Sequence, residues 1–196
     1  NPPFFLWCRS PDLNLHGGAF EPDWSPDGKT IAYTTFLGTK TVIYAVDLET
    51  LETRPLSTRG NKNENPDWSP DGEYLAFTSD EKGIDEIWMM REDGSSQQML
   101  TQAGLLKYFS QPDWSADRTR LLAAMKEINQ PAPVNVLVVL DRANPRQGGD
   151  TLLDETMRME DGVFSPDGHW VAFWTVMEGD NLEILMVGSN NIIRRL

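Results

Sequence analysis

The stretch that decides the fold of this chain reads PDWSPDG at residues 22–28, and it recurs unchanged at residues 66–72. A looser copy reads PDWSADR at residues 112–118, and a fourth reads GVFSPDG at residues 162–168. The aromatic residues of successive copies lie 44, 46 and 50 residues apart. A repeat of this period is typical of architectures in which one supersecondary unit stacks against the next.

Each copy predicts a tight turn between two β-strands. Proline presets φ at the first central position, aspartate suits the second, and glycine takes a left-handed conformation before the next strand. Short β-type runs follow every copy, at residues 31–33, 75–77, 121–123 and 171–173. In the third copy Arg118 stands where glycine is expected, so we expect that turn to be strained or built differently.

Two further strands complete each unit. The third strands are predicted at residues 43–46, 87–90, 137–140 and 184–187, and the fourth at residues 55–57, 98–101, 151–153 and 192–195. Four strands per unit, the repeat period and the lack of helical periodicity predict an all-β chain, a β-propeller of four-stranded antiparallel blades. The blades are expected at approximately residues 20–62, 63–108, 109–158 and 159–196, which together form one domain.

The recurring aromatic residue is predicted to pack between neighbouring blades. It is Trp24, Trp68, Trp114 and Phe164 in the four copies. A blade is a small twisted sheet that cannot bury both faces alone, so stacking it against its neighbours supplies the core. An aromatic platform in a binding site is the alternative, and the identical place of these residues in every repeat favours packing.

The composition is that of an acidic globular chain. Its 196 residues carry a formal net charge of −13, and the 39% hydrophobic and 24% charged residues exclude disorder as the main state. Because an acidic surface repels phosphate backbones, we expect no nucleic-acid partner. No apolar run approaches the roughly 20 residues that span a bilayer, so no membrane span is expected. The single cysteine, Cys8, excludes an internal disulfide and a cysteine-based zinc site.

The repeats resemble those of TolB-type β-propellers. The string PDWSPDG followed by IAY or LAF is similar to their WD-like repeat, and the resemblance covers residues 20–196. Related repeats also occur in the non-catalytic propellers of prolyl-oligopeptidase-like peptidases. TolB-type proteins are periplasmic partners of cell-envelope proteins, so the resemblance implies a non-catalytic scaffold for protein–protein interaction or assembly, periplasmic or extracellular. The alternative is an accessory propeller of a prolyl-oligopeptidase-like hydrolase whose catalytic domain lies outside these residues.

The sequence contains no familiar enzyme signature. It has no Gly-x-Ser-x-Gly elbow, no phosphate-binding loop ending in Lys-Ser or Lys-Thr, and no His-Glu-x-x-His motif. The recurring serines, such as Ser25 and Ser69, belong to the turn motif and are expected to hydrogen-bond locally. We therefore expect that the chain is not an enzyme and has no cofactor, with a calcium ion as the one alternative.

The calcium hypothesis rests on three aspartates of the repeat. Asp23, Asp67 and Asp113 share one position in the innermost strand, which the family resemblance places near the central channel. Carboxylates around a channel suit Ca²⁺, a hard cation that takes about six to eight oxygen ligands. Alternatively, these acids accept hydrogen bonds from backbone N–H groups or contact solvent. The fourth copy has Val163 at this position, and no Asp-x-Asp-x-Asp-Gly calcium loop is present.

The connector that enters the second blade is the predicted partner-binding segment. It carries Asn61, Asn63, Glu64 and Asn65. In the family such connectors lie around one mouth of the channel, where partners dock, and loops on a rigid scaffold are where binding residues concentrate. The partner is expected to be a protein or further copies of this chain.

Residues 1–19 are predicted to form two strands of a half blade that precedes the four full blades. Unpaired strand edges are templates for another strand. We therefore expect an oligomer or a fragment of a larger propeller, in which another chain or another part of the polypeptide pairs with these strands. The alternative is that residues 1–18 close a compact four-bladed ring.

Overall fold

The described part of the chain forms sixteen β-strands, which are arranged as four antiparallel sheets. The computed structural model describes residues 18–102, 104, 106–127, 135–145, 149–153, 159–177, 181–188 and 193–195. Blade 1 contains β1 (Ala19–Trp24), β2 (Thr30–Leu37), β3 (Lys40–Asp47) and β4 (Thr53–Ser57). Blade 2 contains β5 (Asn63–Trp68), β6 (Tyr74–Ser79), β7 (Glu86–Arg91) and β8 (Gln98–Met99). Blade 3 contains β9 (Lys107–Trp114), β10 (Arg120–Glu127), β11 (Asn135–Asp141) and β12 (Asp150–Thr151), and blade 4 contains β13 (Met159–Phe164), β14 (Trp170–Met177), β15 (Asn181–Gly188) and β16 (Ile193–Arg195).

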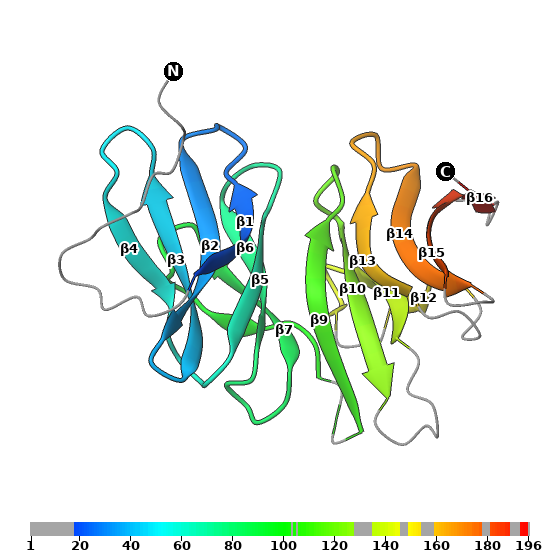
Figure 1. Ribbon diagram of the computed structural model, residues 1–196, viewed down its shortest axis with the longest axis horizontal. Coiled ribbons are helices and arrows are strands. Elements are labelled where there is room, and N and C mark those ends of the chain that lie inside the picture. The colour runs from blue at the N-terminus through cyan, green and yellow to red at the C-terminus, as the bar shows by residue number, and fades with distance from the viewer. Residues whose placement is uncertain are drawn as a thin grey trace.

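The predicted architecture of four-stranded antiparallel blades is confirmed. Within each blade the strands are hydrogen-bonded in chain order, from the inner strand to the outer strand. Figure 1 shows the blades following one another from left to right, with β1 and β5 on one side of the centre and β9 and β13 on the other. The inner strands of successive blades contact each other, β1 with β5, β5 with β9, and β9 with β13.

The outer strands β8 and β12 are shorter than the sequence predicts, at two residues each. In blade 2 the side chain of Thr101 replaces part of the backbone ladder. The N–H of Ile87 donates to Thr101 Oγ1 at 2.9 Å. The strand therefore ends early although the chain stays bound to β7.

The repeated turn is closed by a serine and an aspartate, and the predicted local bond of the serine with backbone is present beside a bond to the aspartate side chain. In the first copy Ser25 Oγ donates to Asp27 Oδ1 at 2.6 Å and accepts from the N–H of Thr30 at 2.9 Å. The same serine–aspartate bond is 2.6, 2.6 and 2.5 Å long in the next three copies. These serines hold the turn between the first two strands of each blade, which fixes where the inner strand ends.

In the third copy Arg118 adopts the left-handed conformation that glycine adopts in the other three copies. Its φ is 63°, close to the 71° of Gly28, and its N–H donates to the carbonyl of Ser115 at 2.8 Å. The turn is therefore the same one, built with a residue that pays a steric penalty in the left-handed region. The side chain also crosses to blade 2, where Arg118 Nη1 lies 2.7 Å from Asp71 Oδ2.

The core lies between the blades, and two of the recurring tryptophans are buried there as predicted. Trp68 is 7% exposed and shares one buried cluster with Ile43 and Ala45 of blade 1. Trp114 is 5% exposed and shares another buried cluster with Ile87 of blade 2. Each tryptophan therefore packs against the blade that precedes it in the chain.

Trp24 corrects this prediction for the first copy. Its side chain is 58% exposed, although its sequence context is identical to that of Trp68. The described residues contain no blade that precedes blade 1, and this is the neighbour against which the other tryptophans pack. Burial at this repeat position is therefore set by the adjacent blade and not by the motif.

The predicted half blade at residues 1–19 falls mainly outside the described residues, which begin at residue 18. Ala19 itself belongs to β1. Whether a half blade precedes blade 1 thus stays a prediction.

Candidate functional site

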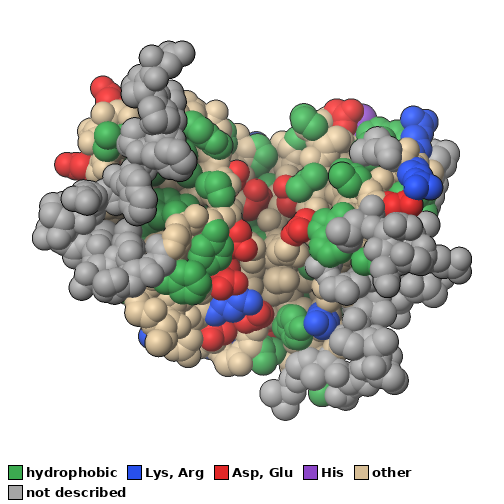
Figure 2. Space-filling view, viewed as in Figure 1, with side chains coloured by type: hydrophobic (Ala, Val, Ile, Leu, Met, Phe, Trp, Pro, Cys, Tyr) green, Lys and Arg blue, Asp and Glu red, His purple; other side chains and the backbone are tan. Residues whose placement is uncertain are grey.

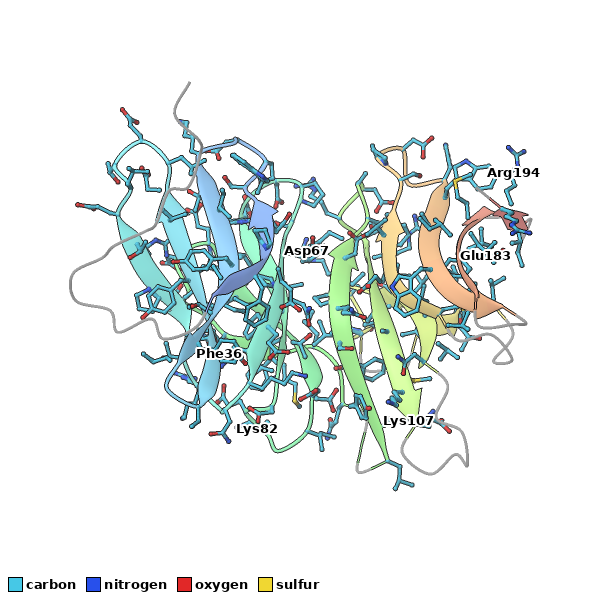
Figure 3. All side chains as sticks on the ribbon, in the orientation of Figure 1. Phe36, Asp67, Lys82, Lys107, Glu183 and Arg194 are labelled. Atoms are coloured by element: carbon cyan, nitrogen blue, oxygen red, sulfur yellow. The ribbon has the colours of Figure 1, made fainter. Side chains whose placement is uncertain are left out.

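A cavity of about 350 Å³ lies where the four inner strands meet, and all four blades contribute to it. Figure 2 shows acidic side chains around a hollow between the two halves of the molecule, and Figure 3 places Asp67 between β5 and β9 at the centre. Three consecutive repeat positions supply the wall, which consists of Glu21, Pro22, Asp23, Asn65, Pro66, Asp67, Gln111, Pro112, Asp113, Asp161, Gly162 and Val163. We call this the axial cavity.

A β-bulge in every inner strand turns these residues toward the axis. In β1 the pairing with β2 shifts between Phe20 and Asp23, so two residues, Glu21 and Pro22, lie opposite one. Proline has no N–H to give to the ladder, which favours the bulge there. The first bulged residue is left-handed in all four blades, with φ between 50° and 54°, at Glu21, Asn65, Gln111 and Asp161. A bulge of this kind re-aims side chains, and here it places four polar groups at one level of the axis.

The three repeat aspartates join each blade to the next. Asp23 Oδ2 accepts from the backbone N–H of Trp68 at 2.6 Å, and Asp67 Oδ2 accepts from Trp114 at 2.7 Å. Asp113 Oδ2 accepts from Phe164 at 2.7 Å. The alternative that these acids accept backbone N–H groups is therefore what the structure shows. Their partners lie one blade further along the chain, so these bonds are inter-blade tethers.

The side chains at the bulge form further hydrogen bonds, both between blades and within blade 4. Glu21 Oε2 accepts from the N–H of Asn65 at 3.0 Å, and the amide of Gln111 donates to Asp161 Oδ1. Trp174 Nε1 donates to Asp161 Oδ2 at 2.6 Å. The wall of the axial cavity is consequently preorganised, because both its backbone and its polar side chains are fixed by bonds.

Burial dominates the electrostatics of the axial cavity. The pKa of Asp113 is raised to about 6, because desolvation and the charge on Asp23 raise it by more than the hydrogen bond from Phe164 lowers it, and desolvation is the largest of these effects. Desolvation also raises the pKa of Asp67 well above its usual value, and the charges on Asp113 and Asp23 add to this. The pKa of Asp23 is raised as well, mainly by desolvation. The described lining contains carboxyl groups and amides but no lysine or arginine, so the cavity favours cationic groups.

The three aspartates do not form a ready cation cage. In the described part of the chain, no group of three or more His, Cys, Asp or Glu side chains is arranged to hold a metal ion. Each repeat aspartate instead commits one oxygen to a tether. Calcium binding at Asp23, Asp67 and Asp113 thus stays a prediction.

Thermal unfolding tests the calcium prediction. If Ca²⁺ binds the folded chain at the repeat aspartates, millimolar Ca²⁺ raises Tm through mass action, and Mg²⁺ raises it less because it prefers a tighter octahedral site. Asp67→Asn should abolish the rise. An unchanged Tm for the unmutated chain, or an equal rise in Asp67→Asn, would end the calcium hypothesis.

The four predicted partner-binding residues are not equivalent in the structure. Asn61 is exposed, Glu64 is half-buried and bonded to Thr41 Oγ1 at 3.0 Å, and Asn65 lines the axial cavity. Asn63 is 1% exposed. Its side-chain oxygen accepts from Ser57 and Ser79, and its side-chain nitrogen donates to the carbonyls of Thr41 and Arg59. Asn63 is therefore a buried structural residue, a correction to its assignment as a contact residue.

Sequence reasoning did not single out Glu21 and Gln111, which line the axial cavity beside Asn65 and Asp161. A signal was present, because a polar residue stands three positions before the aromatic in all four copies and a proline follows it in three. Recognising it requires knowing that the proline opens a bulge. The repeat pattern alone places these residues on a strand without fixing the face.

Comparison with known proteins gives a family match and a curated relative. The family model of the TolB beta propeller domain matches residues 9–195. An uncharacterized protein of Agrobacterium fabrum is 32% identical over 157 residues, which are 76% of this chain and 52% of that protein. The chain thus spans about half the length of this curated relative.

Solved structures with the same fold include two described as TolB. TolB from Acinetobacter baumannii matches with a TM-score of 0.76 and 23% identity, over 92% of this chain and 43% of that one. A putative TolB from Agrobacterium tumefaciens matches with a TM-score of 0.73 and 22% identity, over 91% of this chain and 61% of that one. Within the described residues we find no helix with the length and apolar character of a membrane span. The family match across nearly the whole chain, together with four tethered blades, shows that this protein belongs to the TolB β-propeller domain family.

Proposed function

We propose that this chain is a non-catalytic scaffold for protein–protein interaction, acting in the periplasm or outside the cell. The observation that carries the proposal is the axial cavity, which is rigid, open and acidic, and is built from equivalent positions of four blades. Rigid scaffolds that present polar side chains at a mouth are suited to recognition. The resemblance to TolB-type proteins supports the cellular location.

The charge of the axial cavity indicates which side chains a partner would place in it. Five carboxyl groups and two amides face it from the described residues, so a partner segment that enters it should carry lysine or arginine. Because the wall is already bonded in place, binding requires little ordering of this chain. The contact is then sensitive to salt, since both the cavity mouth and the entering side chain are in contact with solvent.

An affinity pull-down with charge variants tests this function. The unmutated chain and the Glu21→Gln/Asp161→Asn variant are immobilised and exposed to extract from the native source. Glu21→Gln keeps a side-chain oxygen that can accept from the N–H of Asn65, and Asp161→Asn keeps one that can accept from Trp174. The amide nitrogen of the new asparagine replaces the oxygen that accepts from Gln111, so the Gln111 amide has to turn its own oxygen toward it. We expect a protein that is retained by the unmutated chain and released by salt, and that the variant retains at least about tenfold less, because charge-assisted contacts are lost.

The matched control is Glu92→Gln/Asp93→Asn, which removes the same two charges from an exposed turn of blade 2. This variant should retain the partner as the unmutated chain does. Retention of the same proteins by all three chains, or of none above blank resin, would contradict a protein-binding role for the axial cavity. Equal Tm values for the three chains establish that folding is not what changed.

The accessory-propeller alternative has its own support. A prolyl endopeptidase structure matches with a TM-score of 0.63 and 12% identity, over 94% of this chain and 30% of that one. This likeness concerns the fold. The alternative predicts that the gene encodes a hydrolase domain beyond these residues, whereas the scaffold proposal predicts none.

A further inference from the structure

A second cavity, of about 410 Å³, lies at the outer part of the contact between blades 2 and 3. It is lined by residues 98–100, in and after β8, and by residues 142–145 of the turn that follows β11. Its volume falls within the range of small-molecule sites. It is separate from the axial cavity, with which it shares no lining residue. We call it the rim cavity.

The equivalent place between blades 1 and 2 is closed. There the turn after β7 lies directly against blade 1, and a Cβ on Gly94 would come within 2.7 Å of the carbonyl oxygen of Leu56. Arg54 Nη2 also donates to the carbonyl of Glu92 at 2.8 Å, which seals the edge of this contact. Close approach of the two blades therefore depends on a glycine.

Backbone bonds show which residues of blade 3 take these places. The N–H of Gly94 donates to Arg91, and the N–H of Asn144 donates to Asp141 in the same way. Asn144 thus stands where blade 2 has Gly94, and Arg142 stands where it has Glu92. A side chain at position 144 prevents the close approach seen at Gly94, so the blades stay apart and the rim cavity remains between them.

Arg142 lines the rim cavity and lies beside two aromatic rings. Its guanidinium carbon lies 5.0 Å from the centre of the Tyr74 ring and 5.3 Å from that of Trp114. Within the described residues the guanidinium has no hydrogen bond and no ion pair. The contacts with the two rings position the guanidinium and leave its N–H groups without acceptors among the described residues. A planar fork of donors fixed in this way is preorganised for a carboxylate.

We infer that the rim cavity binds a carboxylate attached to a small apolar group, with Arg142 as its anion-binding residue. Met99, Leu100 and Pro145 supply apolar lining for the body of the ligand. Gln98 and Asn144 supply amides that hydrogen-bond its polar atoms. Asp141 precedes Arg142 in the sequence, and its carboxylate is bonded to backbone instead: Asp141 Oδ1 accepts from the N–H of Ala143 at 2.7 Å. The net charge of −13 makes a site of this kind selective, since anions are repelled elsewhere on the surface.

NMR titration with N-acetyl-leucine tests this inference. We expect saturable shifts of the Arg142 Nε–H signal and of the Asn144 amide signal. N-acetyl-leucinamide has the same body without the charge, and it should bind at least about tenfold more weakly. Inorganic phosphate, an anion without an apolar body, should also bind more weakly. Equal binding of the acid and its amide, or no saturable shift with the acid, would overturn the inference.

Two variants distinguish the contribution of the rim cavity to ligand binding from that of the aromatic stack. Arg142→Gln should weaken N-acetyl-leucine binding at least about tenfold. Arg91→Gln is the matched control, because Arg91 lies 5.7 Å from the centre of the same Tyr74 ring but does not line the rim cavity. It should leave the affinity unchanged. Equal losses in both variants would show that the stack and not the cavity matters, and would contradict the inference.

The source of the carboxylate is settled by a second ligand. A peptide of three glycines followed by a C-terminal leucine, acetylated at its N-terminus, is titrated beside N-acetyl-leucine. Tighter binding of the peptide assigns the rim cavity to the C-terminal end of a protein or peptide. Equal affinity assigns it to a free small acid.

Discussion

Trp68→Ala is expected to lower the free energy of unfolding by about 3–5 kcal/mol, the range found when a large buried aromatic side chain is removed. Trp68 is 7% exposed and contacts the core of blade 1 as well as that of its own blade. Its removal leaves a cavity between two rigid sheets that cannot collapse without breaking the Asp23 tether to the N–H of residue 68. Denaturant unfolding followed by tryptophan fluorescence and far-UV circular dichroism measures the loss.

Two control variants test the explanation. Trp24→Ala alters the same repeat position where the side chain is 58% exposed, so it should cost about 1 kcal/mol or less. Trp68→Phe keeps most of the ring volume and removes an indole N–H that has no hydrogen-bond partner among the described residues. We expect it to be nearly as stable as the unmutated chain. Equal costs for Trp68→Ala and Trp24→Ala would mean that burial between blades does not determine stability.

Asp113→Asn is expected to stabilise the chain at pH 7.5 by up to about 3 kcal/mol, the equivalent of a shift of about two pKa units. Burial raises the pKa of Asp113 to about 6 from an unfolded value of 3.8. A group of this kind stabilises the fold below the unfolded pKa, and the stability is lost as pH rises through the folded pKa. At pH 7.5 the buried carboxylate is charged and opposes folding. Asparagine removes that charge and keeps an oxygen for the N–H of Phe164.

The measurement is the free energy of unfolding at pH 4.5 and at pH 7.5 for both chains. The unmutated chain should lose more stability over this interval than Asp113→Asn does. Asp117→Asn is the control from the same blade, because hydrogen bonds from Ser115 and Thr119 lower the pKa of Asp117 to about 2. Asp117 stays charged across the interval, so its replacement should leave the pH dependence unchanged. If stability depended equally on pH in all three chains, this would contradict the conclusion that burial raises the pKa of Asp113.

The fold could be predicted from the sequence because each unit carries its own turn chemistry. The serine and aspartate of PDWSPDG form the same bond in every copy, and this bond depends on residues two positions apart. Even Arg118 obeys the pattern, since the turn imposes a left-handed backbone on it. Local hydrogen bonds and the alternation of apolar residues depend on residues that are close in sequence. They can therefore be predicted without knowing which blades lie on either side.

The face on which a residue lies was decided by the tertiary structure. The bulge at residues 21–22 rotates the inner strand, and only the assembled blades show that Glu21 and Gln111 reach one cavity. Asn63 looks like a surface loop residue in the sequence. It is buried because side chains and carbonyls from two blades surround its amide. Partners that are distant in sequence leave no local signal.

The sequence by itself determined the repeat, the strands and the blades of this protein, because these depend on bonds within about fifty residues of chain. The tertiary structure alone decided which residues of the identical motifs are buried and which groups they bond to. Trp24 and Trp68 share their sequence context, yet one is exposed and the other buried, because only the second has a described blade before it. Asp23, Asp67 and Asp113 are likewise tethers because the next blade brings an N–H to each of them. Burial and charge desolvation are properties of the contact between blades, and a single repeat does not contain them.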